Sequence, residues 1–122
     1  MVITGNGETV VSCGRGIAPL IELIESGKNF KGCFAADKIV GKAAALLYAH
    51  MGVAEVYAEV LSVAAERVLL AYGINVSYSV LTDKIINRKG DGICPMEIAV
   101  ADVNFPEEAF AVLREKAGKR NK

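Results

Sequence analysis

The chain has 122 residues, 52% of them hydrophobic and 23% charged, and its 14 basic and 14 acidic residues leave no net charge. This length suits one domain, residues 1–122, that buries a core without metal or disulfide bridges. A neutral chain creates no overall field that attracts nucleic acid or an anionic membrane, so its composition argues against both partners. The high hydrophobic share leaves apolar surface for a partner subunit, so a homo-oligomer is one expectation.

Three cysteines, at positions 13, 33 and 94, are an odd and widely separated set without a C-x-x-C pair. They indicate reduced thiols, and with them a cytoplasmic protein rather than a disulfide framework. The N-terminus lacks the basic and then apolar pattern of a secretory signal. No apolar run approaches the ~18 residues that a membrane helix needs.

Residues 2–4 and 9–12 are rich in β-branched side chains and flank an Asn6-Gly7 turn signal, which predicts a hairpin. Helical periodicity and short strand-like runs then alternate. They predict a helix over 17–26, a strand over 32–36, a helix over 40–51, a strand over 54–57, a helix over 63–72, a strand over 74–80, and helices over 94–100 and 105–116. Residues 82–91 are polar and irregular, which predicts a loop, with or without one helical turn over 83–86.

This alternation predicts an α/β fold whose sheet is mainly parallel after the hairpin. Ligand sites in such sheets lie where loops lead into helix starts. Two stretches have this design: the helix start at Gly41-Lys42, and the glycine-bearing loop that leads to the helix start at Cys94. We expect these two helix starts to face each other across one small pocket.

Three stretches of the chain, together with the order of elements, resemble an uncharacterised prokaryotic family, domain of unknown function 1893. The stretches are Asp37-Lys38-Ile39-Val40-Gly41-Lys42-Ala43-Ala44-Ala45, Tyr72-Gly73-Ile74-Asn75-Val76-Ser77-Tyr78, and Ile86-Asn87-Arg88 leading to Cys94-Pro95-Met96-Glu97. The resemblance covers about residues 14–100. It implies a cytidine-deaminase-like fold, a three-layer α/β/α sandwich with a mixed sheet opened by the N-terminal hairpin.

Zinc deaminases carry H-x-E or C-x-E at one helix start and P-C-x-x-C at another, and these supply the zinc ligands and the proton-shuttling carboxylate. The corresponding stretches here are Val40-Gly41-Lys42 and Cys94-Pro95-Met96-Glu97. Valine is no metal ligand, lysine cannot replace the carboxylate, and Glu97 stands where the second thiolate would be. The resemblance therefore implies a protein that is not a zinc-dependent deaminase and holds no metal or other cofactor.

Without the zinc motifs, the two helix starts favour an anion site, because each helix N-terminus is equivalent to about half a positive charge. We expect the pocket to bind a small anionic ligand that resembles a nucleoside or nucleotide. Its expected ligand-binding residues are Asp37, Lys38, Gly41, Lys42, Asn87, Arg88, Cys94 and Glu97.

Structural explanations remain open for several of these residues. Lys42 could pair with Glu97 or Asp37 in a purely structural ion pair. The carboxylate of Asp37 could instead accept hydrogen bonds at the helix start. The loop that contains Asn87 and Arg88 could serve only to reverse the chain.

Cys94 supports a second hypothesis, a metal-independent enzyme in which Cys94 and Lys42 are catalytic. A thiol at a helix start near a lysine has a lowered pKa and is a better nucleophile. The alternative is that Cys94 is a small buried residue. His50, the sole histidine, lies near the far end of its helix and suits a dipole partner better than a general base. A third hypothesis is a non-catalytic homo-oligomeric interaction protein.

Overall fold

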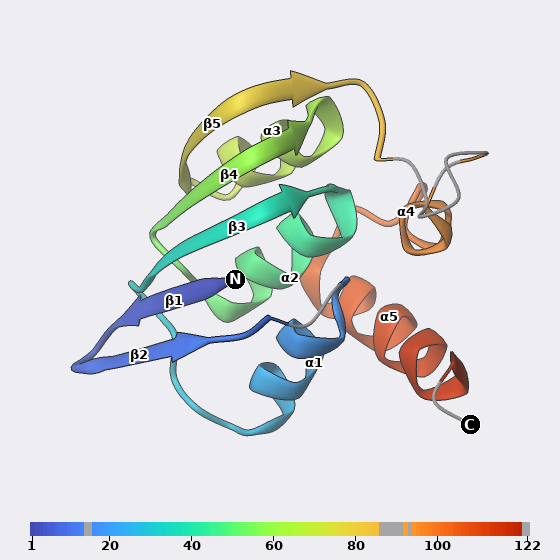
Figure 1. The fold of residues 1–122 in the computed structure, drawn as a ribbon. Helices are drawn as coiled ribbons and strands as arrows, with labels where there is room; N and C mark the ends of the chain where they lie inside the picture. The colour runs from blue at the N-terminus through green and yellow to red at the C-terminus, as the bar shows by residue number, and fades with distance from the viewer. Residues whose placement is uncertain (14–15, 86–91, 93, 121–122) are drawn as a thin grey trace.

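The computed structural model describes residues 1–13, 16–85, 92 and 94–120. One five-stranded sheet has the strand order β2–β1–β3–β4–β5 (Figure 1). The strands are β1 (Val2–Gly5), β2 (Glu8–Val11), β3 (Phe34–Val40), β4 (Glu55–Ser62) and β5 (Asn75–Thr82). β1 is antiparallel to β2 and β3, whereas β3, β4 and β5 are parallel to one another. The predicted mixed sheet, opened by a hairpin and parallel after it, is confirmed.

The helices follow the predicted order. They are α1 (Ala18–Glu25), α2 (Lys42–Met51), α3 (Val63–Ala71), α4 (Pro95–Ala99) and α5 (Pro106–Arg120). α3 begins after Ser62, whose hydroxyl accepts a hydrogen bond from the Ala65 amide at 3.0 Å. α2 ends at Gly52, whose φ of 77° is the left-handed conformation that glycine adopts without strain. Every helix in the described part of the chain is too short or too polar to span a bilayer.

β3 is longer than its predicted range, and the difference concerns two predicted site residues. The strand continues to Val40, so Asp37 and Lys38 lie inside it rather than in the connection to the helix. Both charges are accommodated, because the Asp37 carboxylate accepts a hydrogen bond from the buried Tyr48 hydroxyl and Lys38 is largely solvent-exposed. The charged residues Asp37 and Lys38 therefore do not mark the end of β3, as the sequence analysis had assumed.

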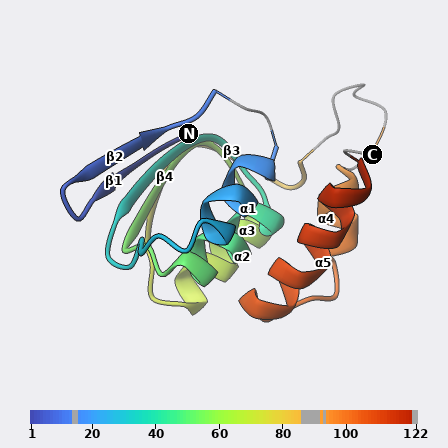
Figure 2. The ribbon, with the colours of Figure 1, turned by 90° about the horizontal axis from the view of Figure 1, so that it is seen from below.

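The order of the layers corrects the predicted α/β/α sandwich. α1, α2 and α3 cover one face of the sheet, and α4 and α5 lie on the far side of these helices (Figure 2). Among the described residues, the sheet is consequently an outer layer with one open face. The reason is topological: the crossovers through α1, α2 and α3 all advance in the same direction across the sheet. Right-handed crossovers that advance in one direction place their helices on one face.

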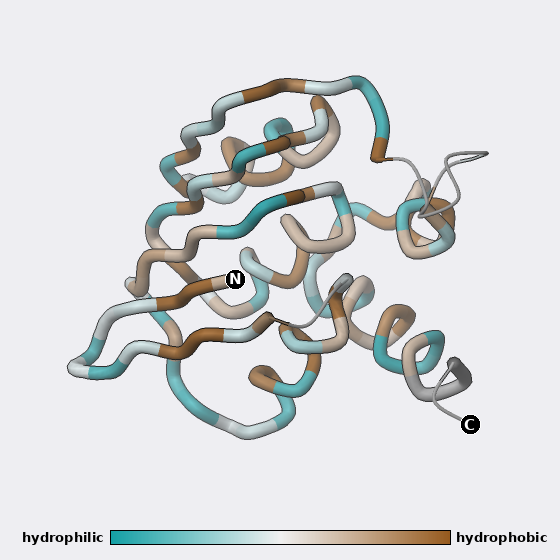
Figure 3. The backbone as a smooth tube through the Cα atoms, viewed as in Figure 1, coloured by the Kyte–Doolittle hydropathy of each residue, from teal (hydrophilic) through white to brown (hydrophobic). Residues whose placement is uncertain are grey.

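The core lies between this helix-covered face and α5, with α2 at its centre. The strands carry both hydrophobic and hydrophilic residues, as along β4 and β5 (Figure 3). Across the sheet, the row that contains Ile3, Ala35 and Val56 faces the helices and is buried, whereas the adjacent row through Val2 and Tyr57 is exposed. In α2 every residue from Ala43 to Tyr48 is buried, as its continuous apolar sequence predicted. The start of α2 is thereby fixed against the carboxyl ends of the parallel strands.

Candidate functional site

A cavity of ≈ 260 Å³ lies at the carboxyl ends of the parallel strands, where α2 and α3 begin. We call it the Lys42–Glu97 pocket. Its lining comes from the starts of both helices, from the segment after β5, and from α4 with the turn that follows it. The lining residues are Lys42, Ser62, Ala64, Asp83, Lys84, Ile85, Glu97 and Ala101. This is the edge of a parallel sheet at which ligand sites usually form.

The carboxylate of Glu97 caps the first turn of α2. Oε1 accepts a hydrogen bond from the backbone N–H of Lys42 at 2.7 Å, and Oε2 accepts one from that of Ala43 at 2.8 Å. These amides belong to the first turn of the helix, where N–H groups have no intrahelical acceptor. A negative charge there is also favoured by the helix dipole. The start of α2 is therefore occupied by a carboxylate of the chain itself, not open to an external anion.

Gly41 makes this close approach possible. A Cβ built at this position would overlap the Glu97 carboxylate and lie 2.8 Å from Cγ1 of Ile85. The φ of Gly41 is −99°, which any residue can adopt, so the requirement for glycine here is steric rather than conformational. Gly41, Lys42 and Glu97, all predicted site residues, thus meet at one point.

The Lys42 amine does not bond to Glu97. Its Nζ donates a hydrogen bond to the backbone carbonyl of Ala101 at 2.9 Å. Lys42 is thus joined to Glu97 through its backbone N–H, which differs from the predicted structural ion pair. The pocket also exposes Asp83 and Lys84, which follow β5 directly.

Ser62, Asp83 and Lys84 are not among the predicted site residues. The sequence pattern identifies Ser62 as the cap of α3, and its side chain is buried at 2% exposure while it lines the pocket. The segment after β5 is predicted as a polar loop, but only its later part is assigned to the site. Their positions in the chain could have identified these residues. Ser62 ends β4, Asp83 and Lys84 follow β5, and all parallel strands end at the same edge of the sheet.

The remaining predicted residues lie elsewhere or outside the described part of the chain. Cys94 precedes α4 and is half-buried against the core, and its side chain does not line the pocket. Asp37 and Lys38, on β3, do not line it either. Asn87 and Arg88 lie outside the described residues.

Asp37 instead forms a polar contact between β3 and α2. Its carboxylate accepts the Tyr48 hydroxyl at 2.8 Å and the Lys38 backbone N–H at 2.8 Å. Burial of Tyr48, and then the neighbouring charge and hydrogen bond of Asp37, raise the pKa of the Tyr48 hydroxyl well above its usual value. The tyrosine therefore remains a neutral donor, and the alternative in which Asp37 accepts local hydrogen bonds agrees with the structure.

The residues around α4 do not fit a zinc ion. Both carboxylate oxygens of Glu97 accept backbone N–H groups of α2, and Val40 provides no donor atom. Among the described residues, no three His, Cys, Asp or Glu side chains are grouped so that they could hold a metal. The sequence-based statement that no zinc is bound stays a prediction.

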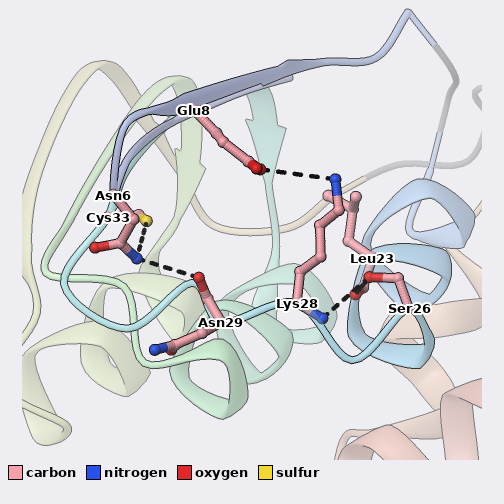
Figure 4. Close-up of polar contacts among 7 residues, drawn as sticks. All are labelled: Asn6, Glu8, Leu23, Ser26, Lys28, Asn29 and Cys33. Carbon is pink, nitrogen blue, oxygen red and sulfur yellow. Dashed lines mark hydrogen bonds and ion pairs between the residues drawn. The ribbon is translucent and has the colours of Figure 1, made fainter.

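A second cavity, of ≈ 220 Å³, lies at the opposite end of the sheet near the β1–β2 turn. The side-chain amide of Asn6 donates to the Asn29 carbonyl at 3.1 Å and to Sγ of Cys33 at 3.6 Å (Figure 4). Lys28 and Glu8 form an exposed ion pair at 3.7 Å across the same region. These contacts connect the hairpin turn to the segment between α1 and β3, and we interpret them as structural.

Comparisons with known proteins give the same family as the sequence. A family model described as domain of unknown function (DUF1893) matches residues 1–117. The chain is similar to the crystal structure of a DUF1893 family protein from Thermotoga maritima, with 29% sequence identity and a TM-score of 0.85. That match covers 94% of this chain and 78% of the other. None of the curated proteins matches the chain.

Proposed function

Because the chain belongs to the DUF1893 family, a domain of unknown function, we propose its function from the chemistry of its own site. It is a zinc-free, deaminase-like protein that binds a small anionic ligand, similar to a nucleoside or nucleotide, in the Lys42–Glu97 pocket. One observation carries this proposal: the amine of Lys42 lies at the pocket while the adjacent carboxylate is held by backbone amides.

The charge balance of the pocket supports an anionic ligand. Lys42 and Lys84 are both among the residues that line it. The charge of Glu97 is offset by the start of α2, which is equivalent to about half a positive charge and donates two hydrogen bonds. Among the described lining residues, Asp83 is then the one carboxylate that no helix start holds. An anion between the two amines would give Lys42 and Lys84 a partner of opposite charge.

The size of the pocket limits the ligand. At ≈ 260 Å³ it lies just below the range of about 300–1,000 Å³ that is typical of small-molecule sites. It therefore suits one ring or one phosphate group with the rest of the molecule outside. The amines would hold the phosphate or carboxylate, and the oxygens of Asp83 and Glu97 could accept N–H groups of a base. This combination favours a nucleotide over a simple carboxylic acid.

The deaminase-like part of the proposal is supported by topology alone. The sheet begins with a hairpin, and its parallel strands lead into helices at the edge where the pocket lies. Because Val40, Lys42 and Glu97 do not provide a zinc site, no deamination step is assigned to these residues. Sharing a fold does not imply sharing a reaction.

Thermal unfolding in the presence of ligands tests the proposal. We expect inorganic phosphate or a nucleoside monophosphate to raise the melting temperature of the wild-type chain, since a ligand that binds only the folded state stabilises it. Lys42→Ala should abolish the shift. Lys31→Ala, which removes an exposed lysine far from the pocket lining, should retain it.

The panel should also contain cytidine, which lacks the phosphate, and a small dicarboxylate. A shift with cytidine that Lys42→Ala does not change would show that the amine has no role in binding. No shift with any compound would contradict the proposal and favour the non-catalytic interaction protein.

A further inference from the structure

Two rows of exposed side chains cross the open face of the sheet at the end where the parallel strands begin. Strand pairing is continuous across all five strands in both rows. In the order of the strands, one row is Thr9, Thr4, Phe34, Glu55 and Asn75, and the other is Val11, Val2, Ala36, Tyr57 and Ser77. All ten residues are exposed, and we call them the open rows.

The composition of the open rows is that of an interface rather than of a water-facing surface. Glu55 is the one charged residue among the ten, whereas roughly 25–35% of the residues on a soluble surface carry a charge. Phe34 and Val11 are 52% and 64% exposed. No described element covers this face (Figure 2). A contiguous apolar surface of this kind marks an interaction site.

A second copy of the sheet can cover this face completely. β3 is the central strand of the five, with two strands on each side. A two-fold axis that runs along β3, midway between two facing sheets, places β3 over β3, β1 over β4 and β2 over β5 of the second copy. Each row then faces the same row of the second copy. Sheets pack face to face with nearly aligned strands at a spacing of about 10 Å.

The residues that this axis brings together are complementary. Phe34 faces Phe34 of the second copy at the axis, and Val2 faces Tyr57. Glu55 faces Thr4, whose hydroxyl can donate a hydrogen bond to a carboxylate. The two copies of Glu55 lie on opposite sides of the axis, so the carboxylates are kept apart.

Charges beyond the open rows favour the same axis. Lys38 and Glu59 are exposed on the central strands β3 and β4, whose other face is covered by helices, so they belong to the open side. An axis along β3 flanks each Lys38 with Glu59 of the second copy, which gives two charges of each sign. An axis across the strands at Tyr57 would instead place Glu55 opposite Glu59, and like charges that face each other are destabilising.

The area of the face is sufficient for a dimer. The five strands have between four and eight residues. Strands about 4.8 Å apart, with a rise of about 3.3 Å per residue, therefore form a face of roughly 24 by 20 Å. The accessible surface of the side chains exceeds this projection, so two copies together bury on the order of 1,200 Å², the lower end of the range for specific interfaces.

From this complementarity of shape and charge we propose that two copies of this chain dimerise by packing the open faces of their sheets together, about a two-fold axis along β3. The interface is isologous, since the same surface contributes both halves. The helices lie on the two outer sides of the dimer. The Lys42–Glu97 pocket has no part in the interface, so the dimer does not depend on ligand binding.

Analytical ultracentrifugation between about 1 and 100 µM tests the dimer, a range that suits a small interface. We expect the wild-type chain to sediment with twice the mass of one chain at the highest concentration. Phe34→Lys should be monomeric, because the axis brings the two ammonium groups together. Ile98→Lys, at a similarly exposed position on α4, should remain dimeric. A wild-type monomer at the highest concentration, or a dimer that survives Phe34→Lys, would overturn the proposal.

Two substitutions at Thr4 test the axis. Thr4→Lys places an ammonium group opposite Glu55 of the second copy, and Thr4→Glu places a carboxylate there. Both variants lose the same hydrogen bond to Thr9, so they are matched. We expect the dimer of Thr4→Glu to have a dissociation constant about tenfold higher than that of Thr4→Lys, since each dimer contains two such contacts. In a Glu55→Lys background the order should reverse, and equal dissociation constants in both backgrounds would refute the axis along β3.

Discussion

Glu97 and Lys42 are 55 residues apart in the sequence, yet the Glu97 carboxylate accepts the backbone N–H of Lys42 at 2.7 Å. Through this contact the five-residue helix α4 provides the cap of α2, the most deeply buried helix of the protein. The same contact forms one wall of the Lys42–Glu97 pocket. Stability and the shape of the candidate site therefore depend on one carboxylate.

Removing that carboxylate should destabilise the fold. Glu97→Ala leaves the N–H groups of Lys42 and Ala43 without their acceptor, and we expect a loss of about 1–3 kcal/mol in the free energy of unfolding. Glu97→Gln keeps one carbonyl oxygen and should cost roughly half as much by the same reasoning. Urea denaturation measures both. Glu59→Ala, an exposed position on the sheet, should stay within about 0.5 kcal/mol of wild type; an equal loss there would contradict the assignment.

Adding one methyl group at Gly41 should also destabilise the protein. The Cβ of Gly41→Ala would overlap Glu97 and press on Ile85, so we expect a cost of about 1–3 kcal/mol, as for other overpacked sites. The double variant Gly41→Ala with Glu97→Ala should lose less than the sum of the single losses, because the main clash has been removed. Strict additivity in urea denaturation would argue against the Gly41–Glu97 contact as the cause.

The buried Tyr48 hydroxyl predicts a dependence of stability on alkaline pH. Tyr48→Phe removes a hydrogen bond to the Asp37 carboxylate and should cost about 1.5–3 kcal/mol near pH 7. The pKa of Tyr48 is raised in the folded state above its ordinary 10.0, so above pH 10 the unfolded chain loses this proton while the folded chain keeps it. The contribution of Tyr48 to stability is therefore present below pH 10 and lost as the pH rises above it.

Urea denaturation of wild type and Tyr48→Phe at pH 8 and pH 11 isolates the contribution of the Tyr48 hydroxyl. All other titrating groups are present in both proteins, so their effects on stability cancel in the difference. The difference between wild type and Tyr48→Phe should shrink by about 1.4 kcal/mol at pH 11. A difference that stays constant with pH would show that the hydroxyl ionises equally in both states.

The cysteines predict an order of reaction with iodoacetamide in the native protein. Cys13 is exposed, Cys94 is half-buried and Cys33 is buried, so labelling should proceed in that order. Cys33 should react only on unfolding, as mass spectrometry of digested samples can show. If Cys94 reacted before Cys13, its thiol would be activated, and the metal-independent enzyme would become the better hypothesis.

The sequence by itself determined the element order, the mixed sheet and the family. Local signals suffice for these: Asn6-Gly7 specifies the hairpin turn, Ser62 caps α3, and the all-round apolar sequence of α2 requires burial. The sequence also selected Gly41, Lys42 and Glu97, which do lie together.

Only the tertiary structure decided which atoms of these residues meet and how the layers are ordered. Glu97 binds the backbone N–H of Lys42 rather than its amine, because the start of α2 lies against α4 and leaves two unpaired amides there. The sheet is an outer layer because three crossovers advance in one direction. The place of Asp37, bonded to Tyr48 inside β3, likewise follows from packing between elements, which local sequence patterns do not encode.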